Sequence, residues 1–324
     1  MLSFETILEK IRIAIEELDF ERQPNELYAP ISYTLSLGGK RLRPVLCLMA
    51  CDMFGGKIED AVPAALGLEI FHNFTLLHDD IMDEAPIRRG KESVYKKWNT
   101  NVAILSGDTM MALAYGQIME TPENMHSGVF KIFNQTAIEV CEGQQYDMDF
   151  ETADNVTIDD YLKMIRLKTA VLLAGSLKIG AMIGGAETED AENLYHFGEN
   201  IGIAFQLKDD LLDVFSDEQK FGKKTGGDIL TNKKTYLYLK AFELAKGETL
   251  ANLTSLYSGN QKNDIEKIKG VISIYEQLNI KEFTAELIEI YYRQAMTSLE
   301  KVKVPESQKA ELKKFAGNLK GREY

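Results

Sequence analysis

Cysteine is scarce in this sequence, and the scarcity excludes the class of proteins held together by disulfide bonds. The 324 residues contain only Cys47, Cys51 and Cys141, too few and too scattered for a disulfide framework. A reducing compartment fits this usage best, so we expect a cytoplasmic protein. Cys47 and Cys51 share a helix face, with His72 and His78 the nearest histidines in sequence. Core packing is favoured over a zinc site, because unpaired cysteines are commonly buried.

Basic residues are outnumbered by acidic ones. Lysine and arginine together number 37, aspartate and glutamate 50, and the formal net charge is −13. This balance argues against a nucleic-acid-binding surface and against docking on anionic lipid. It leaves a phosphate-containing ligand open, because a local basic cluster can outweigh the average charge.

Long uninterrupted apolar runs are also missing. The longest, residues 170–186, contains Lys178 and falls short of the roughly 20 residues that a membrane-spanning helix needs. The N-terminal MLSFETILEKIRIAIEELDF carries Glu5 and Glu9 where a signal peptide needs positive charge, and it lacks a small-residue cleavage site. We therefore expect an amphipathic N-terminal helix and no stable insertion into a membrane.

Proline is absent between Pro122 and Pro305. This long stretch has apolar residues at i, i+3 and i+4 almost throughout, the spacing of amphipathic helices. Thr157 or Asp159 is a candidate cap for one of them, and strand-like alternation with hairpin turns is missing. No Ser/Gly-rich linker divides the chain. The sequence predicts an all-α protein of about ten or more helices, folded as a single domain over residues 1–324.

Aspartates gather at the ends of two apolar helical stretches. One stretch ends in LLHDDIMDEAPIRRG and the other in FQLKDDLLD, and both contain Asp-Asp-x-x-Asp. The residues are Asp79, Asp80 and Asp83 in the first set, and Asp209, Asp210 and Asp213 in the second. The outer two of each set lie on one helix face, about 6 Å apart along the axis. Like charges so close together are unfavourable unless a cation compensates.

Carboxylates one helical turn apart point to a magnesium site. Mg²⁺ prefers oxygen ligands and is usually bound by one or two carboxylates together with substrate phosphates. A single acidic pattern of this kind is more often a solvated helix end. Two copies, each directly after an apolar helical stretch, favour a functional site. The pattern fits a clamp for Mg²⁺ and diphosphate better than a calcium site, because EF-hand spacing is absent.

Cationic residues cluster beside glycines and near the aspartates. Arginine forks and lysine point charges bind diphosphates, and glycine-rich turns let backbone N–H groups approach an anion. The clusters are GGKRLRP from Gly38, IRRG from Ile87, RLKTA from Arg166 and FGKKTGGDILTNKK from Phe221. Each alone would be a solvated surface, but their common position beside the aspartates favours a diphosphate site.

The motifs GGKRLRP, LLHDDIMDEAPIRRG, GQQYD, RLKTA, GIAFQLKDDLLD and GKKTGGD occur in this order, in a region from Gly38 to Lys233. In this set and order they resemble the motifs of the trans-prenyltransferases, the isoprenyl diphosphate synthases or polyprenyl synthetases. The short-chain geranylgeranyl and farnesyl diphosphate synthases are the most similar members. The resemblance implies the isoprenoid synthase fold, a large helical bundle around a central cavity, and usually a homodimer. It also implies condensation of isopentenyl diphosphate with an allylic diphosphate, assisted by Mg²⁺, with three ions in each active site.

The resemblance assigns roles residue by residue. Asp79, Asp83 and Asp209 would bind Mg²⁺, while Asp80, Asp210 and Asp213 would act mainly through ordered waters. The contacts to isopentenyl diphosphate would be Gly39, Lys40, Arg43, His72 and Arg89. The contacts to the allylic diphosphate would be Arg88, Lys168, Thr169, Gln206, Lys223 and Lys233, with Lys168 and Lys223 also catalytic. Lys224-Thr225 differs from the dipeptide of many relatives, which leaves open whether Lys223 or Lys224 reaches the diphosphate. His78 is expected to support the helix end rather than act as a base.

Product length depends on how far an apolar tunnel extends from the metals. Phe71, Phe74 and Thr75 precede Asp79 by eight, five and four residues and lie on its helix face. A Phe74 ring about 7.5 Å further down the axis can form a floor, while Thr75 leaves the nearer position open. In the family, C15 producers often have aromatics at the nearer position, and long-chain producers have small residues at both. The pair fits a C20 product best, with C15, C25 and a plain core role for the aromatics as alternatives.

Three rival functions would each predict a different set of motifs. A class I terpene cyclase would lack GGKRLRP and carry a different second metal motif. A non-catalytic subunit of a heteromeric synthase would have a degraded aspartate motif, whereas both are complete here. A simple metal- or phosphate-binding module has no need of two apolar helices that end in carboxylates. Acyl-transfer chemistry is not indicated, since the sequence has no nucleophile elbow or catalytic triad pattern.

Overall fold

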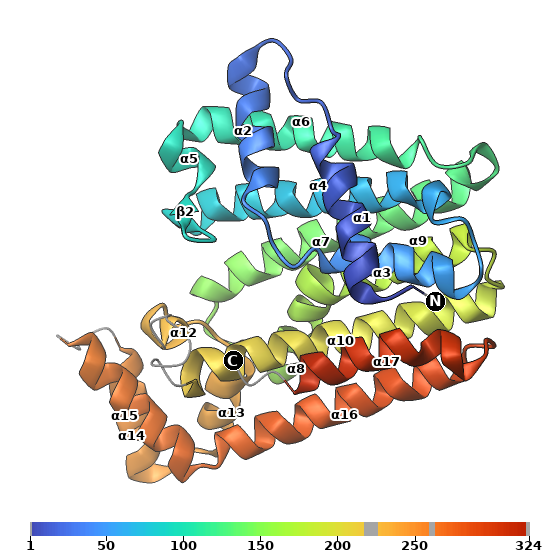
Figure 1. Cartoon of the computed structure of the whole chain (residues 1–324). Helices are drawn as coiled ribbons and strands as arrows, with labels where there is room; N and C mark the ends of the chain where they lie inside the picture. The colour runs from blue at the N-terminus through green and yellow to red at the C-terminus, as the bar shows by residue number, and fades with distance from the viewer. Residues whose placement is uncertain (1, 217–225, 259–262, 322–324) are drawn as a thin grey trace. The chain divides into compact units, whose positions relative to one another are not determined.

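The computed structural model describes residues 2–216, 226–258 and 263–321. Helices make up most of these residues (Figure 1), which confirms the all-α prediction. Strand structure in these ranges is confined to β1 (Ile87–Arg88) and β2 (Lys91–Glu92), which pair antiparallel as a short hairpin. Each described helix is too short or too polar to cross a membrane.

The chain divides into two compact units. The first comprises Met1–Ala137, Leu172–Tyr195 and Lys301–Leu312, and the second comprises Ile138–Val171, His196–Glu300 and Lys313–Tyr324. The single domain expected from the sequence stays a prediction.

The first unit is built around α4 and α6, which lie side by side (Figure 1). A Cβ on Gly67 of α4 would lie 2.9 Å from the Ala114 carbonyl oxygen of α6, so the glycine permits this close approach. The helices that begin in this unit are α1 (Phe4–Glu16), α2 (Asn25–Ser36), α3 (Leu42–Met53), α4 (Ile58–Met82), α5 (Val94–Lys97), α6 (Thr100–Ile118), the short 3₁₀ helix η1 (Glu123–Met125), α7 (His126–Thr152), α10 (Thr188–Phe215) and α17 (Glu306–Lys320). α9 (Val171–Ile183) lies almost entirely in it.

The two neighbouring cysteines belong to the core of the first unit. Cys47 and Cys51 are free and buried on α3. A Cβ on Gly180 of α9 would lie 1.9 Å from the Cys47 carbonyl oxygen, so the helices touch at this point. Burial raises the pKa of the Cys47 thiol and raises that of Cys51 to about 12. Both thiols are therefore protonated core groups, and the expected core packing of the two cysteines is confirmed.

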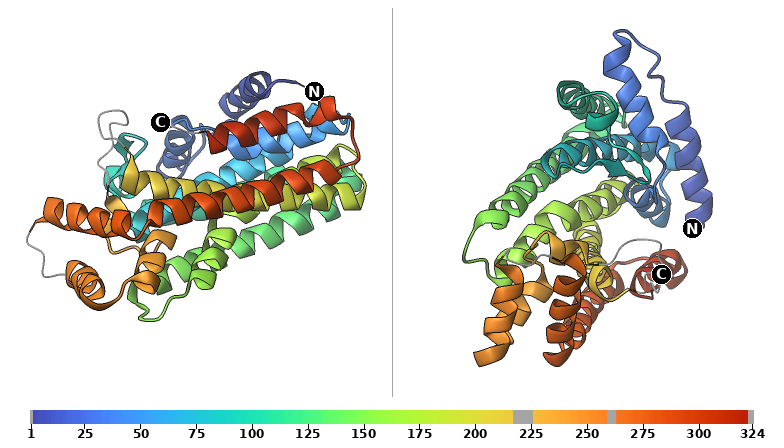
Figure 2. Two further views of the ribbon diagram at one scale, coloured as in Figure 1. Left: turned by 90° about the horizontal axis from the view of Figure 1, so that it is seen from below. Right: turned by 90° about the vertical axis from the view of Figure 1, so that its left-hand side faces the viewer.

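The second unit has its own apolar core, in which Leu207, Leu211, Val271 and Tyr275 are buried. Its helices are α8 (Ile158–Ile165), the π-helical turn η2 (Arg166–Ala170), α12 (Gly227–Leu230), α13 (Tyr236–Leu244), α14 (Gly247–Tyr257), α15 (Asp264–Gln277) and most of α16 (Ile280–Lys301), with the later part of α17 (Glu306–Lys320). The larger part of α7, from Ile138 onwards, and the larger part of α10, from His196 onwards, also belong to it. α14 and α15 lie side by side (Figure 2).

The cap of α8 is Thr157, one of the two residues that the sequence offered. Its side chain accepts from the Asp160 N–H at 3.1 Å, and the Asp160 carboxylate accepts from the Thr157 N–H at 3.0 Å. This reciprocal pair is a capping box, which satisfies two backbone donors that the first helical turn leaves unpaired. Thr157 rather than Asp159 therefore starts the helix that leads into the π-helical turn.

Candidate functional site

The first aspartate set lies at the C-terminal end of α4. Asp79 and Asp80 are in the last turn, and Asp83 is the capping residue, whose N–H donates to the Asp79 carbonyl oxygen at 2.8 Å. Asp80 is 4 % exposed, whereas Asp83 is largely exposed. Negative charge is unfavourable here, because the C-terminal end of a helix dipole is itself negative. Cations near this helix end would therefore be stabilising.

Arg88 supplies one of these cations. It lies on β1, and its Nε donates to Asp80 Oδ1 at 2.8 Å. The hairpin that returns it towards α4 turns through two residues of positive φ, Arg89 (52°) and Gly90 (75°). Burial raises the pKa of the Asp80 carboxyl above its ordinary value, against the opposing effect of Arg88. The structure thus brings a predicted allylic-diphosphate contact onto the middle aspartate of the first set.

Four of the residues predicted to contact isopentenyl diphosphate gather in the first unit. Gly39 has φ +130°, and a Cβ there would lie 2.8 Å from Arg89 Cζ, so the glycine leaves room for the guanidinium. Arg89 donates to the Gly38 carbonyl oxygen. Arg43 Nη1 lies 3.0 Å from His72 Nε2. The fifth predicted contact, Lys40, is exposed on the same loop.

Arg43 also determines which nitrogen of the His72 ring carries the proton. A guanidinium can only donate hydrogen bonds, so His72 Nε2 accepts and the neutral ring carries its proton on Nδ1. Burial, followed by the charges of Arg43 and Arg89, lowers the pKa of His72 well below its ordinary value. Burial likewise lowers the pKa of Arg43 to about 10. His72 therefore takes part in this cluster as a neutral ring.

Arg41 has a different role from the neighbouring cations of GGKRLRP. Its guanidinium donates to Glu69 and to the Leu35 carbonyl oxygen at the end of α2. The Arg41 and Glu69 side chains are 5 % and 2 % exposed, and Asn73 Nδ2 also donates to Glu69 at 2.8 Å. Sequence reasoning missed Glu69, although a single acidic residue inside the apolar run AALGLEIF is itself a signal of a buried, paired charge.

The second aspartate set lies near the end of α10, in a polar network of the second unit. Asp210 is 5 % exposed and accepts from the Tyr161 hydroxyl and from Gln206 Nε2, the latter at 2.9 Å. The Thr169 hydroxyl donates to Gln206 Oε1 at 3.2 Å. Burial raises the pKa of both Asp210 and Tyr161. The structure thus brings Thr169, Gln206 and Asp210 together, and Tyr161 is a member that the sequence analysis missed.

The outer aspartates of the second set, Asp209 and Asp213, are both half-buried. Asp213 Oδ2 accepts from the N–H of Asp228 at 2.9 Å. Burial, followed by the charges of Asp210 and Asp213, raises the pKa of the Asp228 carboxyl to about 7. Asp228 belongs to GKKTGGD and received no role from the sequence. The structure adds it to the carboxylates around this set.

Lys168 and Lys233 meet at one carboxylate. Lys168 Nζ donates to Asp147 Oδ2 at 2.7 Å, and Lys233 Nζ lies 3.6 Å from the same oxygen. Lys234, counted with the cations of the last cluster, instead donates to the carbonyl oxygens of Phe150 and Ala153, both at 2.6 Å. It therefore satisfies the end of α7. Lys223 and Lys224 lie outside the described residues.

The three residues predicted to set product length differ in their surroundings. Phe71 is fully buried, and its ring centroid lies 5.5 Å from that of Phe133 on α7. Phe74 is half-buried, with its centroid 4.8 Å from the His78 ring. The Thr75 hydroxyl donates to the His72 carbonyl oxygen at 2.8 Å. Phe71 is thus a core aromatic, which was the alternative to a tunnel role.

His78 ties α4 to α6, as expected of a residue that supports the helix end. Its Nε2 lies 3.2 Å from the Ile104 carbonyl oxygen. A Cβ on Gly107 would lie 2.2 Å from the same nitrogen, so the glycine makes room for the ring.

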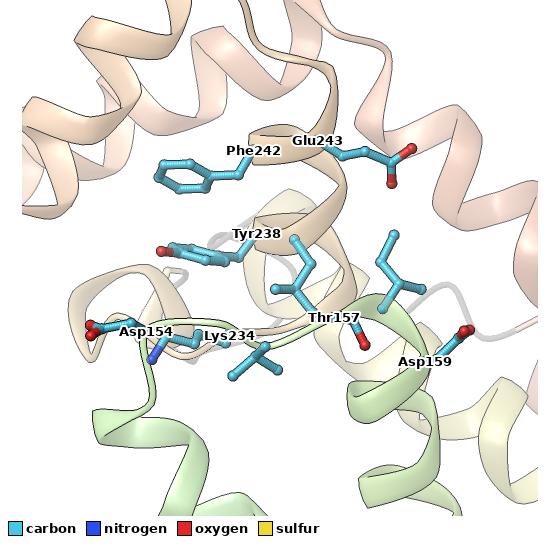
Figure 3. A pocket seen from close by; sticks show the side chains of 10 residues that line it. Asp154, Thr157, Asp159, Lys234, Tyr238, Phe242 and Glu243 are labelled. Carbon is cyan, nitrogen blue, oxygen red and sulfur yellow. The ribbon is translucent and has the colours of Figure 1, made fainter.

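An open pocket of about 460 Å³ lies elsewhere in the second unit (Figure 3). The rings of Tyr238 and Phe242 lie side by side along it, with centroids 4.5 Å apart. Thr157, Asp159 and Glu243 are also on its lining. Within the described part of the chain, none of the predicted substrate contacts lines this pocket, so it is not part of the site built above.

Comparison with known proteins agrees with these motifs. The polyprenyl synthetase family model matches residues 24–275. The geranylgeranyl diphosphate synthase of Methanosarcina mazei is 45% identical over 233 residues, 71% of this chain and 72% of that one. The enzyme of the same name from Sulfolobus acidocaldarius is 38% identical over 281 residues, 86% and 84% of the two chains. A crystal structure of a geranylgeranyl pyrophosphate synthase matches with a TM-score of 0.92 and 43% identity over 100% of both chains. The predicted isoprenoid synthase fold is thereby confirmed.

Proposed function

We propose a reaction for this chain, which belongs to the polyprenyl synthetase family. The reaction is the condensation of isopentenyl diphosphate with an allylic diphosphate, and the product is geranylgeranyl diphosphate, C20. The observation that carries the proposal is the 45% identity with a geranylgeranyl diphosphate synthase over 233 residues, in a chain whose two aspartate motifs are complete. C15 and C25 products are the alternatives within the same chemistry.

The donor atoms around the two aspartate sets fit magnesium. They are carboxylate oxygens, the hard ligands that Mg²⁺ prefers. No group of three or more His, Cys, Asp or Glu side chains within the described residues is arranged to hold a metal by itself. In proteins, Mg²⁺ is usually held jointly by one or two carboxylates and the substrate's phosphate oxygens. Asp79, Asp83 and Asp209 would hold the ions, three per active site. When bound, Mg²⁺ neutralises charge on the leaving diphosphate.

The proposed contacts to the allylic diphosphate are those that the family resemblance assigns. Arg88, Lys168, Thr169, Gln206 and Lys233 supply cations and hydrogen-bond donors for its oxygens, and Lys223 is proposed from the sequence alone. These groups stabilise the diphosphate as the allylic C–O bond breaks and its electron pair leaves with oxygen. The carbocation is then attacked by the double bond of isopentenyl diphosphate. The proton released from the new C–C product goes to the departed diphosphate, so no protein base is needed.

Isopentenyl diphosphate is held by the cluster around Gly39. Arg43 and Arg89 bring two guanidinium groups to the loop, and Lys40 adds an exposed ammonium. His72, neutral and hydrogen-bonded to Arg43, orients that guanidinium and leaves the positive charge on the arginines. The two arginines and Lys40 bind the diphosphate, and neutral His72 only orients Arg43. This arrangement suits isopentenyl diphosphate, whose diphosphate stays attached during the condensation.

The proposal also covers assembly into a homodimer. On α6, Ile104 and Leu105 are 43% and 58% exposed, and Met119 just beyond the helix is 47% exposed. Contiguous exposed apolar patches mark protein–protein interfaces, and we propose that the neighbouring Ile104 and Leu105 form part of one. A second copy of the chain is the partner expected from the family. The cytoplasmic location expected from cysteine usage remains a prediction.

Labelled isopentenyl diphosphate, an allylic starter and Mg²⁺ test the function directly. The expected result is a linear C20 alcohol on chromatography of the dephosphorylated products. Cyclic hydrocarbons would favour a terpene cyclase instead. An absence of elongated product from a folded, metal-loaded protein would overturn the proposal.

A further inference from the structure

The aspartate of the motif GQQYD has no assigned contact with a substrate or a metal, yet it has close ionic contacts in the second unit. Asp147 lies on α7, and its side chain is 15% exposed. One of its oxygens, Oδ2, accepts from Lys168 Nζ at 2.7 Å and lies 3.6 Å from Lys233 Nζ. Because both distances end at the same oxygen, the two ammonium groups are close neighbours. Two segments 65 residues apart in sequence thus converge on one carboxylate.

The packing around Asp147 fixes these partners. One helical turn before it, a Cβ on Gly143 would lie 2.2 Å from the Lys168 backbone nitrogen. Only a glycine lets α7 approach the π-helical turn that carries Lys168 this closely. At the other end, Lys234 donates to the carbonyl oxygens of Phe150 and Ala153 and so fixes the chain beside Lys233 to the end of α7. α7 therefore holds both lysine-bearing segments.

The charges explain why a carboxylate is needed between the lysines. Two ammonium groups held together repel each other unless an anion lies between them. Burial on its own would raise the pKa of Asp147, but Lys233 and Lys168 together lower it, so the carboxyl is ionised at neutral pH. A diphosphate that replaces or joins the carboxylate meets two cations already in place. Preorganisation of this kind reduces the ordering required on binding.

We propose that Asp147 is a positioning residue for the allylic substrate. It holds Lys168 and Lys233 at the spacing that one diphosphate group bridges. The identity of the ligand in this inference rests on the proposed function. The position of the two lysines would suit any diphosphate. Asp147 acts through the lysines and does not itself contact the reacting atoms.

The matched variants are Asp147→Asn and Asp149→Asn. Asp149 lies on the same helix, is exposed and accepts from Gln145 at 2.8 Å, so its substitution removes the same charge without touching the lysines. We expect Asp147→Asn to raise the KM for the allylic diphosphate about tenfold, the size of one lost charge-assisted contact. The KM for isopentenyl diphosphate should stay within about twofold in both variants, as expected when only one substrate's contacts are disturbed. An allylic KM equal to that of Asp149→Asn would overturn the inference.

A double-mutant cycle separates positioning from a general structural effect. If Asp147 acts through Lys168, Asp147→Asn should have little further effect in a Lys168→Met protein. Full additivity of the two changes would contradict the inference. Asp147→Glu, which keeps the charge, should recover part of the allylic KM. If circular dichroism shows that Asp147→Asn is unfolded, Asp147→Glu is compared with Asp149→Asn instead. Its KM for the allylic diphosphate should still be higher than that of Asp149→Asn.

Calorimetry with inorganic diphosphate and Mg²⁺ gives a readout that does not depend on turnover. Weaker binding by Asp147→Asn than by Asp149→Asn supports the inference even if the wild type transfers no prenyl group, in which case only the proposed function fails. A wild type that elongates, together with unchanged diphosphate binding and KM in Asp147→Asn, refutes the inference alone. A wild type that neither elongates nor binds diphosphate refutes both.

Discussion

Arg41 and Glu69 form a buried ion pair that joins the loop before α3 to the middle of α4. Arg41 adopts a left-handed backbone conformation with φ 47°, directly after Gly38 and Gly39 and the exposed Lys40. The pair therefore anchors the backbone of the loop that carries two proposed contacts to isopentenyl diphosphate. It also places an ionic group among apolar residues, where each charge depends on the other.

Removal of Glu69 should destabilise the protein strongly. Glu69→Ala leaves the Arg41 guanidinium buried without its carboxylate, and such a loss typically costs about 3–5 kcal/mol. The free energy of unfolding in urea is the measurement. Glu59→Ala is the control, because Glu59 and its partner Lys10 are 76% and 44% exposed and exposed pairs contribute at most about 1 kcal/mol. Similar losses in the two variants would show that the buried pair does not anchor the loop.

Phe74→Ala should lengthen the product beyond C20, since the ring proposed as the tunnel floor is removed. Chromatography of the dephosphorylated products measures the chain length. Phe71→Ala is the matched change one turn away on the same helix. Because Phe71 is fully buried against Phe133, its loss should lower the free energy of unfolding by about 3–5 kcal/mol without a longer product. An unchanged product from Phe74→Ala would rule out the floor.

Gly39→Ala should impair isopentenyl diphosphate binding selectively. The new Cβ would lie 2.8 Å from Arg89 Cζ, at a φ of +130° that L-residues rarely adopt. We expect the KM for isopentenyl diphosphate to rise about tenfold, equivalent to about 1.4 kcal/mol, with the allylic KM little changed. Gly55→Ala controls for backbone strain, because Gly55 has φ +78° and nothing within 4 Å of the added Cβ. Equal changes of this KM in both variants would show that displacement of Arg89 is not what weakens the binding of isopentenyl diphosphate.

The protonation of His72 predicts a specific loss of stability in acid. Its folded-state pKa lies well below the ordinary value of about 6.5, so the unfolded chain binds the proton more readily. Its contribution is fully present above about pH 6.5 and is lost as the pH falls below that value. Urea unfolding of the wild type and His72→Gln from pH 7.5 to 5 measures this, and the variant should show a shallower decline. Parallel curves would mean that folding does not lower the pKa of His72.

Local sequence features predicted much of the fold and the placement of the aspartates. The helical spacing between Pro122 and Pro305 and the apolar stretches before each Asp-Asp-x-x-Asp depend on interactions within four residues along the chain. A helix therefore forms wherever that spacing persists, and its carboxylates take their places along it. Thr157 as a cap follows from the same local rules, whereas the contact of His78 with the Ile104 carbonyl oxygen joins two helices across 26 residues of sequence.

Tertiary packing alone decided which charged groups meet. Arg41 with Glu69, Lys234 with the end of α7, and Asp147 with Lys168 and Lys233 pair across 21 to 86 residues of sequence. The sequence placed Arg41 and Lys234 among ligand cations, and it gave Asp147 no partner. Composition shows that cations are present, but a buried charge is compensated by whatever group the packed helices bring within reach. Distance in space, which the sequence does not contain, therefore separates structural charges from those available to a diphosphate.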